Sequence, residues 1–392
     1  MATSLGIITV LGLLANYIFT KLKLPGLLGM LLLGIAFGPF GLGVLNEDLM
    51  RVSSDFREIA LIIILLRAGL GLDWDELKSI GIPAVKLSFI PVILEGFTVM
   101  LLSTILFDLS FIEGGILGFI IAAVSPAVVV PTMIALKERG IGSNKNIPTL
   151  ILAGASLDDI VAITIFSSFL GLYTGEKINL FLQFLKVPTS IILGIGIGFV
   201  IGLILVFIFK KYHIRDTKKV LMIVGVALIV MELERLLSSR VQIAGLLGVM
   251  TIGFVILLKR NVVAMRLSLK FNKIWVLAEI LLFVLVGAQV DILVALKAGK
   301  LGVVLIVGGL LIRSLGVFIS LIGSNLNKKE RIFVAISYTP KATVQAAMGS
   351  VPLAYGVASG DIILALAVLA IVITAPLGAI GIKYFSKFLT NG

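Results

Sequence analysis

The chain has 392 residues, of which 59% are hydrophobic and 14% are charged, and its mean hydropathy is +1.19. Soluble domains are about half apolar and about one quarter charged, so this composition excludes a single water-soluble core and indicates a membrane protein. The net charge of +12 comes without a basic stripe that carries interleaved aromatic residues, so it indicates basic cytoplasmic loops and not nucleic-acid binding. Cysteine is absent and His213 is the one histidine, which argues against thiolate sites and histidine-based chemistry.

Apolar segments of membrane-spanning length follow one another along the whole chain. A helix needs about 20 apolar residues to cross the hydrocarbon layer. The first segment, within "MATSLGIITVLGLLANYIF", has neither a basic start nor a clear cleavage site, so we interpret it as a span and not as a signal peptide. The connections are short, and we therefore expect one all-α polytopic membrane domain over residues 1–392. The thirteen predicted spans are 4–20, 26–43, 58–72, 83–107, 114–136, 148–172, 187–209, 218–234, 241–258, 274–290, 301–323, 331–355 and 361–388.

Basic residues are distributed unevenly between alternate connections. The connections on one side hold 21 Lys and Arg, and those on the other side hold 8. Because basic loops face the cytoplasm, we expect a multi-pass protein of the cell membrane with its N-terminus outside and its C-terminus inside. The connections assigned to the cytoplasm are 21–25, 73–82, 137–147, 210–219, 259–273, 324–331 and the C-terminal tail.

Two similar motifs place a proline in the middle of an apolar span. The first, "SPAVVVP", occupies residues 125–131, and the second, "TPKATVQ", occupies residues 339–345. A proline within a span removes a backbone donor and frees a carbonyl, which is tolerated at membrane depth only where protein or a water-filled cavity satisfies it. A simple kink would explain either proline alone. Two at matching positions, one followed directly by Lys341, predict a pair of broken helices.

Charged residues flank the two prolines in the same order. Glu95 lies 31 residues before Pro126, and Arg313 lies 27 before Pro340. Asp159 follows Pro126 by 33 residues, and Asp361 follows Pro340 by 21. The order predicts two inverted six-helix repeats, and such repeats with broken helices are typical of secondary transporters that bind substrate at the midplane. The predicted repeats are 1–172 and 218–388, with a linker helix over 187–209.

Two adjacent acids, Asp158 and Asp159, lie in the apolar segment "AGASLDDIVAIT". A carboxylate at the bilayer centre costs at least about 2.5–3.5 kcal/mol, so the pair is expected to have a function. Such oxygens suit protons and hard cations such as Na⁺, and exchange of one for the other is antiport. Adjacent helical residues are about 100° apart, so one acid should face the ion and the other the broken helices. The alternative is that both acids cap the start of a helix.

Glu95 and Arg313 have opposite charges and equivalent positions in the predicted repeats, so we predict a buried salt bridge between them. Glu95→Ala alone should destabilise the protein strongly, and the charge-reversed double variant Glu95→Arg/Arg313→Glu should recover part of the loss. Arg67 either pairs with an acid or reaches the membrane interface. Gln289 is equally compatible with a packing hydrogen bond and with a role in the site.

Several motifs resemble the monovalent cation/proton antiporter superfamily. They are "GASLDDIVAI", "LLRAGLGLD", "FVLVGAQVDI" and "TPKATVQAAMGSVPLA", and the last looks most like the NHA branch of sodium/proton antiporters. The resemblance covers essentially the whole chain. It implies a dimerisation domain, a six-helix core with two crossed, broken helices, a homodimer, and an elevator-like movement of the core. A bacterial plasma membrane is the location that we expect.

The resemblance also implies roles for individual residues. Asp158 and Asp159 match the two aspartates of the family, with Asp159 as the principal ligand of the transported Na⁺. Lys341 matches the lysine of the second broken helix, and Ser125 and Thr343 are weaker candidates for oxygen contacts. Glu95 and Arg313 match a buried ion pair of related exchangers. Electrogenic members carry lysine where this chain has Arg313, and arginine does not release its proton, so the number of protons stays open.

The sequence therefore predicts a secondary Na⁺(Li⁺)/H⁺ antiporter with no resident cofactor and no catalytic residues. A K⁺/H⁺ antiporter on the same scaffold is one alternative. An ion channel is another, and it would need a continuous polar pore lining and no proton-binding pair. An enzyme is not expected, because no catalytic histidine, Ser/Lys dyad or HExxH-like motif is evident.

Overall fold

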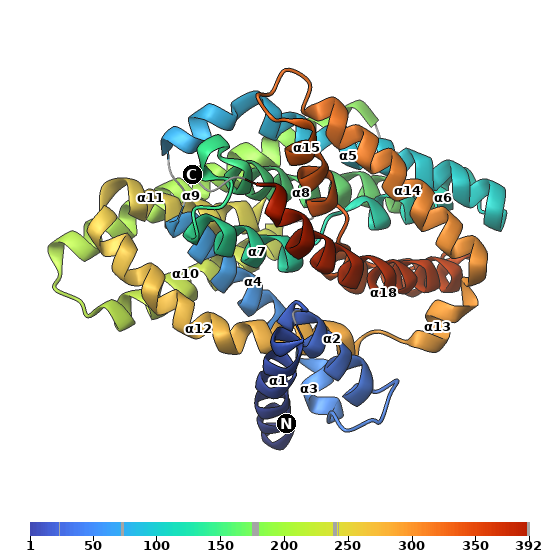
Figure 1. Ribbon diagram of the computed structural model, residues 1–392, viewed down its shortest axis with the longest axis horizontal. Coiled ribbons are helices and arrows are strands. Elements are labelled where there is room, and N and C mark those ends of the chain that lie inside the picture. Colours follow the sequence, from blue (N-terminus) through green and yellow to red (C-terminus); the bar gives the residue numbers. More distant parts are fainter. Residues whose placement is uncertain (23, 72–73, 175–179, 238–240, 242, 390–392) are drawn as a thin grey trace.

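Figure 1 shows a computed structural model of the chain, which describes all residues except 23, 72–73, 175–179, 238–240, 242 and 390–392. The described regular structure is helical throughout. Among the residues that the structure describes, eight helices are long and apolar enough to cross a membrane, and the shorter helices α2 and α11 are apolar as well. The chain is thus an all-helical, multi-pass membrane protein. The exact number of thirteen spans stays a prediction.

Two groups of helices pack mainly among themselves. The first group, which we call the outer bundle, comes from both halves of the chain. Its helices are α1 (Ala2–Lys21), α2 (Gly26–Phe37), α3 (Glu47–Arg51), α4 (Ser53–Leu70), α9 (Leu180–Lys211), α10 (Asp216–Leu237), α11 (Gly245–Lys259) and α12 (Asn261–Ala288). Close approach of α2 and α12 requires glycine, because a Cβ on Gly34 would lie 2.0 Å from the carbonyl oxygen of Val284.

The second group, which we call the core bundle, contains the breaks. Its helices are α5 (Trp74–Phe107), α6 (Phe111–Ala122), α7 (Pro126–Glu138), η1 (Ser143–Lys145), α8 (Ile147–Tyr173), α14 (Gly299–Ser320), α15 (Lys328–Ser337), α16 (Thr343–Met348), α17 (Val351–Ala354), α18 (Gly360–Phe385) and η2 (Ser386–Phe388). The short helix α13 (Ile292–Lys297) follows α12 and packs on α18, so it connects the two bundles.

Both predicted breaks occur at their prolines. Helix α6 ends at Ala122, residues 123–125 are not helical, and Pro126 is the first residue of α7. Proline disfavours helical backbone in the residue before it and suits the first helical position, so Ser125 ends one half and Pro126 begins the next. On the other side, residues 338–342 separate α15 from α16.

Three predicted boundaries are wrong. The predicted connection 73–82 is mostly helical, because α5 already begins at Trp74. The span 26–43 ends as a helix at Phe37, and turns follow that include Gly43 at φ +65°. The predicted loop 259–273 is mostly helical, because α12 already begins at Asn261. Its basic residues suggested a loop, but Val263, Ala264, Leu267 and Phe271 recur on one face and are buried.

Candidate functional site

The two breaks meet inside the core bundle. The backbone nitrogen of Ser125 donates to the carbonyl oxygen of Pro340 at 2.8 Å, and the hydroxyl oxygens of Ser125 and Thr343 lie 3.5 Å apart. A backbone bond between two interrupted helices satisfies groups that the prolines leave without helical partners. The two weaker candidates from the sequence, Ser125 and Thr343, are therefore brought together.

The carboxyl end of α6 is held by donors from the second half of the chain. Arg313 Nη1 and Lys341 Nζ both donate to the carbonyl oxygen of Ala122, the latter at 3.2 Å. Gln345 Nε2 donates to the carbonyl oxygens of Ile120 and Ala123, each at 2.9 Å. The last carbonyls of a helix have no helical partner and carry partial negative charge. Here two cations and an amide satisfy them.

Gln345 was not predicted as a site residue, although it closes the quoted motif "TPKATVQ". Its side chain is buried, and its Oε1 has no hydrogen-bond partner among the described residues. The signal in the sequence was its spacing: Gln345 follows Lys341 by four residues, and both donate to the same end of α6. The side-chain amide joins the two broken helices.

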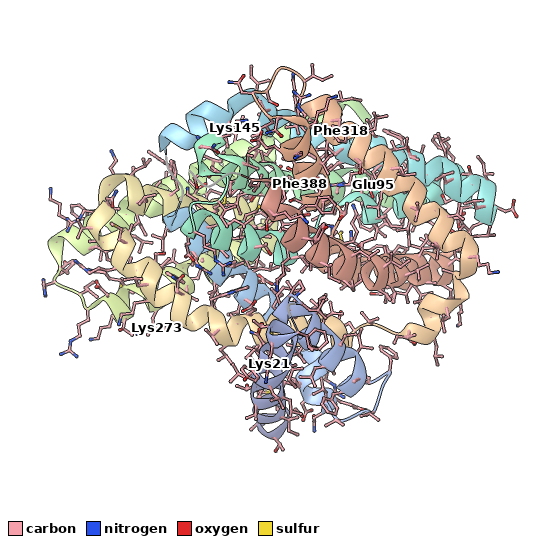
Figure 2. All side chains as sticks on the ribbon, in the orientation of Figure 1. Lys21, Glu95, Lys145, Lys273, Phe318 and Phe388 are labelled. Carbon is pink, nitrogen blue, oxygen red and sulfur yellow. The ribbon has the colours of Figure 1, made fainter. Side chains whose placement is uncertain are left out.

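Five charged side chains are buried together around the contact between the two breaks, and Figure 2 shows Glu95 inside the core bundle. Arg313 Nη1 lies 2.6 Å from Glu95 Oε2, so the two residues that were expected to pair do form an ion pair. Lys341 Nζ lies 2.7 Å from the same Glu95 oxygen. Arg313 Nη2 lies 2.6 Å from Asp158 Oδ2, and Arg313 Nε donates to the carbonyl oxygen of Tyr338. The predicted pair is thus part of a larger network.

The two aspartates lie in the middle of α8 and do not cap its start. Both oxygens of Asp158 have partners, because Oδ1 accepts a hydrogen bond of 2.9 Å from the backbone nitrogen of Val124 and Oδ2 pairs with Arg313. Asp159 differs. Its Oδ1 is buried and has no hydrogen-bond partner among the described residues, and the residue is 8% exposed. Asp158 is held in place, whereas Asp159 keeps an unpartnered oxygen.

Lys341 contacts Glu95 and the end of α6, and none of its described hydrogen bonds goes to an aspartate. Its backbone nitrogen donates to Thr374 Oγ1 at 2.8 Å, which fixes the chain directly after Pro340. The lysine therefore neutralises Glu95 together with Arg313. Lys341 is linked to Asp158 only through two intervening residues, Glu95 and Arg313.

The remaining polar residues that the sequence singled out lie elsewhere. Arg67 pairs with Glu138 at 2.7 Å, and Gln289 donates to the hydroxyl of Ser53 at 3.0 Å. Asp361 is exposed in the first turn of α18. The comparison of the two halves matched Asp361 with Asp159, but Asp361 does not share the buried, mid-helix position of Asp159.

The comparisons with known proteins agree with this architecture. A family model described as "Sodium/hydrogen exchanger, transmembrane" matches residues 6–387. The human protein "Sodium/hydrogen exchanger 9B2" is 35% identical over 377 residues, which cover 91% of this chain and 68% of that protein. Human "Sodium/hydrogen exchanger 9B1" is 33% identical over 374 residues, which cover 91% and 71%.

Among solved structures, the sodium proton antiporter MjNhaP1 from Methanocaldococcus jannaschii matches with a TM-score of 0.77 and 23% identity, over 97% of this chain and 94% of that one. This likeness shows the fold. The family match and the two human relatives confirm the resemblance to the monovalent cation/proton antiporter superfamily. The chain belongs to the transmembrane sodium/hydrogen exchanger family, which is a family of transporters and not of enzymes.

Proposed function

We propose that this protein exchanges Na⁺ or Li⁺ for protons and that Asp159 binds the cation and the proton in turn. The observation that carries the proposal is the unpartnered, buried Oδ1 of Asp159, next to an aspartate whose two oxygens are already engaged. A buried carboxylate without a partner is unfavourable, and either a proton or a hard cation removes that cost. The two ligands therefore compete for one group, as antiport requires.

The charge of the cluster supports an exchange of one proton for one cation. The buried side chains comprise three acids and two bases, so the fully ionised cluster has a charge of −1. The acids are Glu95, Asp158 and Asp159, and the bases are Arg313 and Lys341. One proton or one monovalent cation at Asp159 makes the cluster neutral. Buried net charge is costly, so the two neutral states should be the ones that move across the membrane.

The remaining residues support the site in this proposal. Glu95 pairs with Lys341 and Arg313, and Arg313 in turn fixes Asp158. The guanidinium of Arg313 keeps its proton and therefore does not carry one through the cycle. Ser125 and Thr343 lie where the two breaks meet and are available as neutral oxygen contacts. Asp158 orients the site and contributes to its negative charge.

Access to the site is proposed to alternate through movement of the core bundle against the outer bundle. One turn before Asp159, Ser156 Oγ of α8 lies 3.8 Å from Met250 Sδ of α11. The ion site thus lies beside the boundary between the bundles. Inverted repeats over 1–172 and 218–388, a cytoplasmic C-terminus and a homodimer belong to the same proposal. The exposed apolar side chains of α9, among them Ile192 and Phe207, offer a surface for lipid or a second copy.

Exchange is testable in proteoliposomes that enclose a pH-sensitive dye. With the wild type, addition of Na⁺ or Li⁺ should dissipate the proton gradient that the dye reports. With Asp159→Asn, the gradient should persist. Asp361→Asn removes an exposed carboxylate of α18 and is the matched control, expected to transport at the wild-type rate. Native-rate exchange by Asp159→Asn would show that the site is wrong.

Two further conditions in the same vesicles separate the alternatives. K⁺ as the driving cation tests the K⁺/H⁺ antiporter. A K⁺ ionophore sets the membrane potential, and exchange of one proton for one cation should proceed at the same rate at any potential. Cation flux that is driven by potential alone, without counterflow of protons, would identify a channel.

A further inference from the structure

A second group of charges lies at the boundary between the two bundles, apart from the ion site. Arg67 is near the end of α4 in the outer bundle, and Glu138 ends α7 in the core bundle. Arg67 Nη2 lies 2.7 Å from Glu138 Oε1. The side chain of Arg67 is 10% exposed, whereas that of Glu138 is 50% exposed. The pair therefore connects the bundles through a buried cation and an acid that water can reach.

Arg67 has a second acid within electrostatic reach. Glu279 is half-buried on α12, and the charge of Arg67 acts on its carboxylate. Among the described residues, Glu279 has no hydrogen-bond or ion-pair partner, and Arg67 Nε is likewise buried without an acceptor. Helix α4 lies between α7 and α12, so the guanidinium has one acid in each bundle (Figure 1).

We propose that Arg67 exchanges ion-pair partners as the bundles move: it pairs with Glu138 in the arrangement seen here and with Glu279 when α7 withdraws from α4. The inference rests on the proposed function, because alternating access requires such a movement. An arginine left alone at this depth would oppose the movement. Glu279 supplies the replacement from within the outer bundle.

The two acids should therefore have opposite effects on the equilibrium. Glu138 stabilises only the present arrangement, because in the other arrangement it no longer pairs with Arg67 and its carboxylate is solvated by water. Glu279 has no ion-pair partner among the described residues in the present arrangement and pairs with Arg67 in the other, so it stabilises the other. A group shifts a conformational equilibrium only through a difference in its interactions between the two states, and here each acid has such a difference.

The absence of native cysteine allows a direct measurement. The reporter is the pair Ser156→Cys and Met250→Cys, whose native side chains touch across the same boundary. The initial rate of their cross-linking by a short thiol reagent, in purified protein, measures how often the present arrangement occurs. Glu138→Gln should lower this rate about two- to fivefold, the range expected for a partly exposed ion pair. Adding Glu279→Gln to that variant should return the rate toward that of the parent.

Glu58→Gln is the matched control, because it removes the ion pair of Glu58 with Arg235 inside the outer bundle and should leave the rate unchanged. A rate unaffected by Glu138→Gln, or a double variant as slow as Glu138→Gln alone, would overturn the proposal. The cross-link needs no ion gradient. If the cross-linking rates change as expected but the vesicles show no exchange, only the transport function is rejected. If the vesicles exchange cations for protons but the cross-linking rates do not change as expected, only the partner exchange of Arg67 is rejected.

Discussion

Reversing both charges of the Glu95–Arg313 pair, in the double variant Glu95→Arg/Arg313→Glu, is expected to leave the protein at least as unstable as either single variant. An acid at position 313 would face Asp158 and the carbonyl oxygens of Ala122 and Tyr338, all of which accept from the guanidinium now. An arginine at position 95 would face the ammonium group of Lys341.

The magnitude follows from the number of contacts that the reversal breaks. Removing one partner of a buried pair costs about 3–5 kcal/mol, and the reversed pair regains one such interaction while it creates two repulsive ones. Thermal unfolding of purified protein, followed by intrinsic fluorescence, gives the ranking of wild type, single variants and double variant. A double variant that is clearly more stable than both single variants would refute the network and restore the isolated pair that the sequence alone predicts.

The other predictions concern single contacts. Gln345→Leu leaves carbonyls of α6 without a donor and should cost about 1–3 kcal/mol of stability, measured by the same unfolding assay; an unchanged midpoint would count against the amide as their partner. Gly34→Ala should weaken the contact of α2 with α12, whereas Gly6→Ala, in open space, should not; equal midpoints would reject the close packing. The hydrogen bond from Arg266 lowers the pKa of Asp216, so its contribution to stability is present above the ordinary aspartate pKa and is lost as the pH falls through the lowered value. Arg266→Gln should shift that loss to higher pH in acid unfolding curves, and superimposable curves would contradict this.

Properties that depend on local chemistry could be read from the sequence. Pro126 and Pro340 mark the breaks because proline lacks the donor that an unbroken helix needs. The charges of Glu95 and Arg313 were visible because buried charge without a counter-charge is too costly to retain in a span.

Properties that depend on three-dimensional convergence could not be read in this way. Arg313 binds groups from α5, α6 and α8 as well as Tyr338, and no spacing along the chain predicts such a set. The difference between Asp158 and Asp159 depends on Val124 lying opposite one of them. The start of α12 was missed because its basic residues outweighed the helical spacing of residues such as Leu267 and Phe271.

The most direct test of the central claim counts protons at the binding step. Purified protein in weakly buffered detergent solution is titrated with Na⁺ while an indicator dye records proton release, over a range of starting pH values. We predict a maximum of one proton released for each Na⁺ bound by the wild type, and none for Asp159→Asn. Release of two protons for each Na⁺, or undiminished release from Asp159→Asn, would contradict the assignment of one exchangeable charge to Asp159.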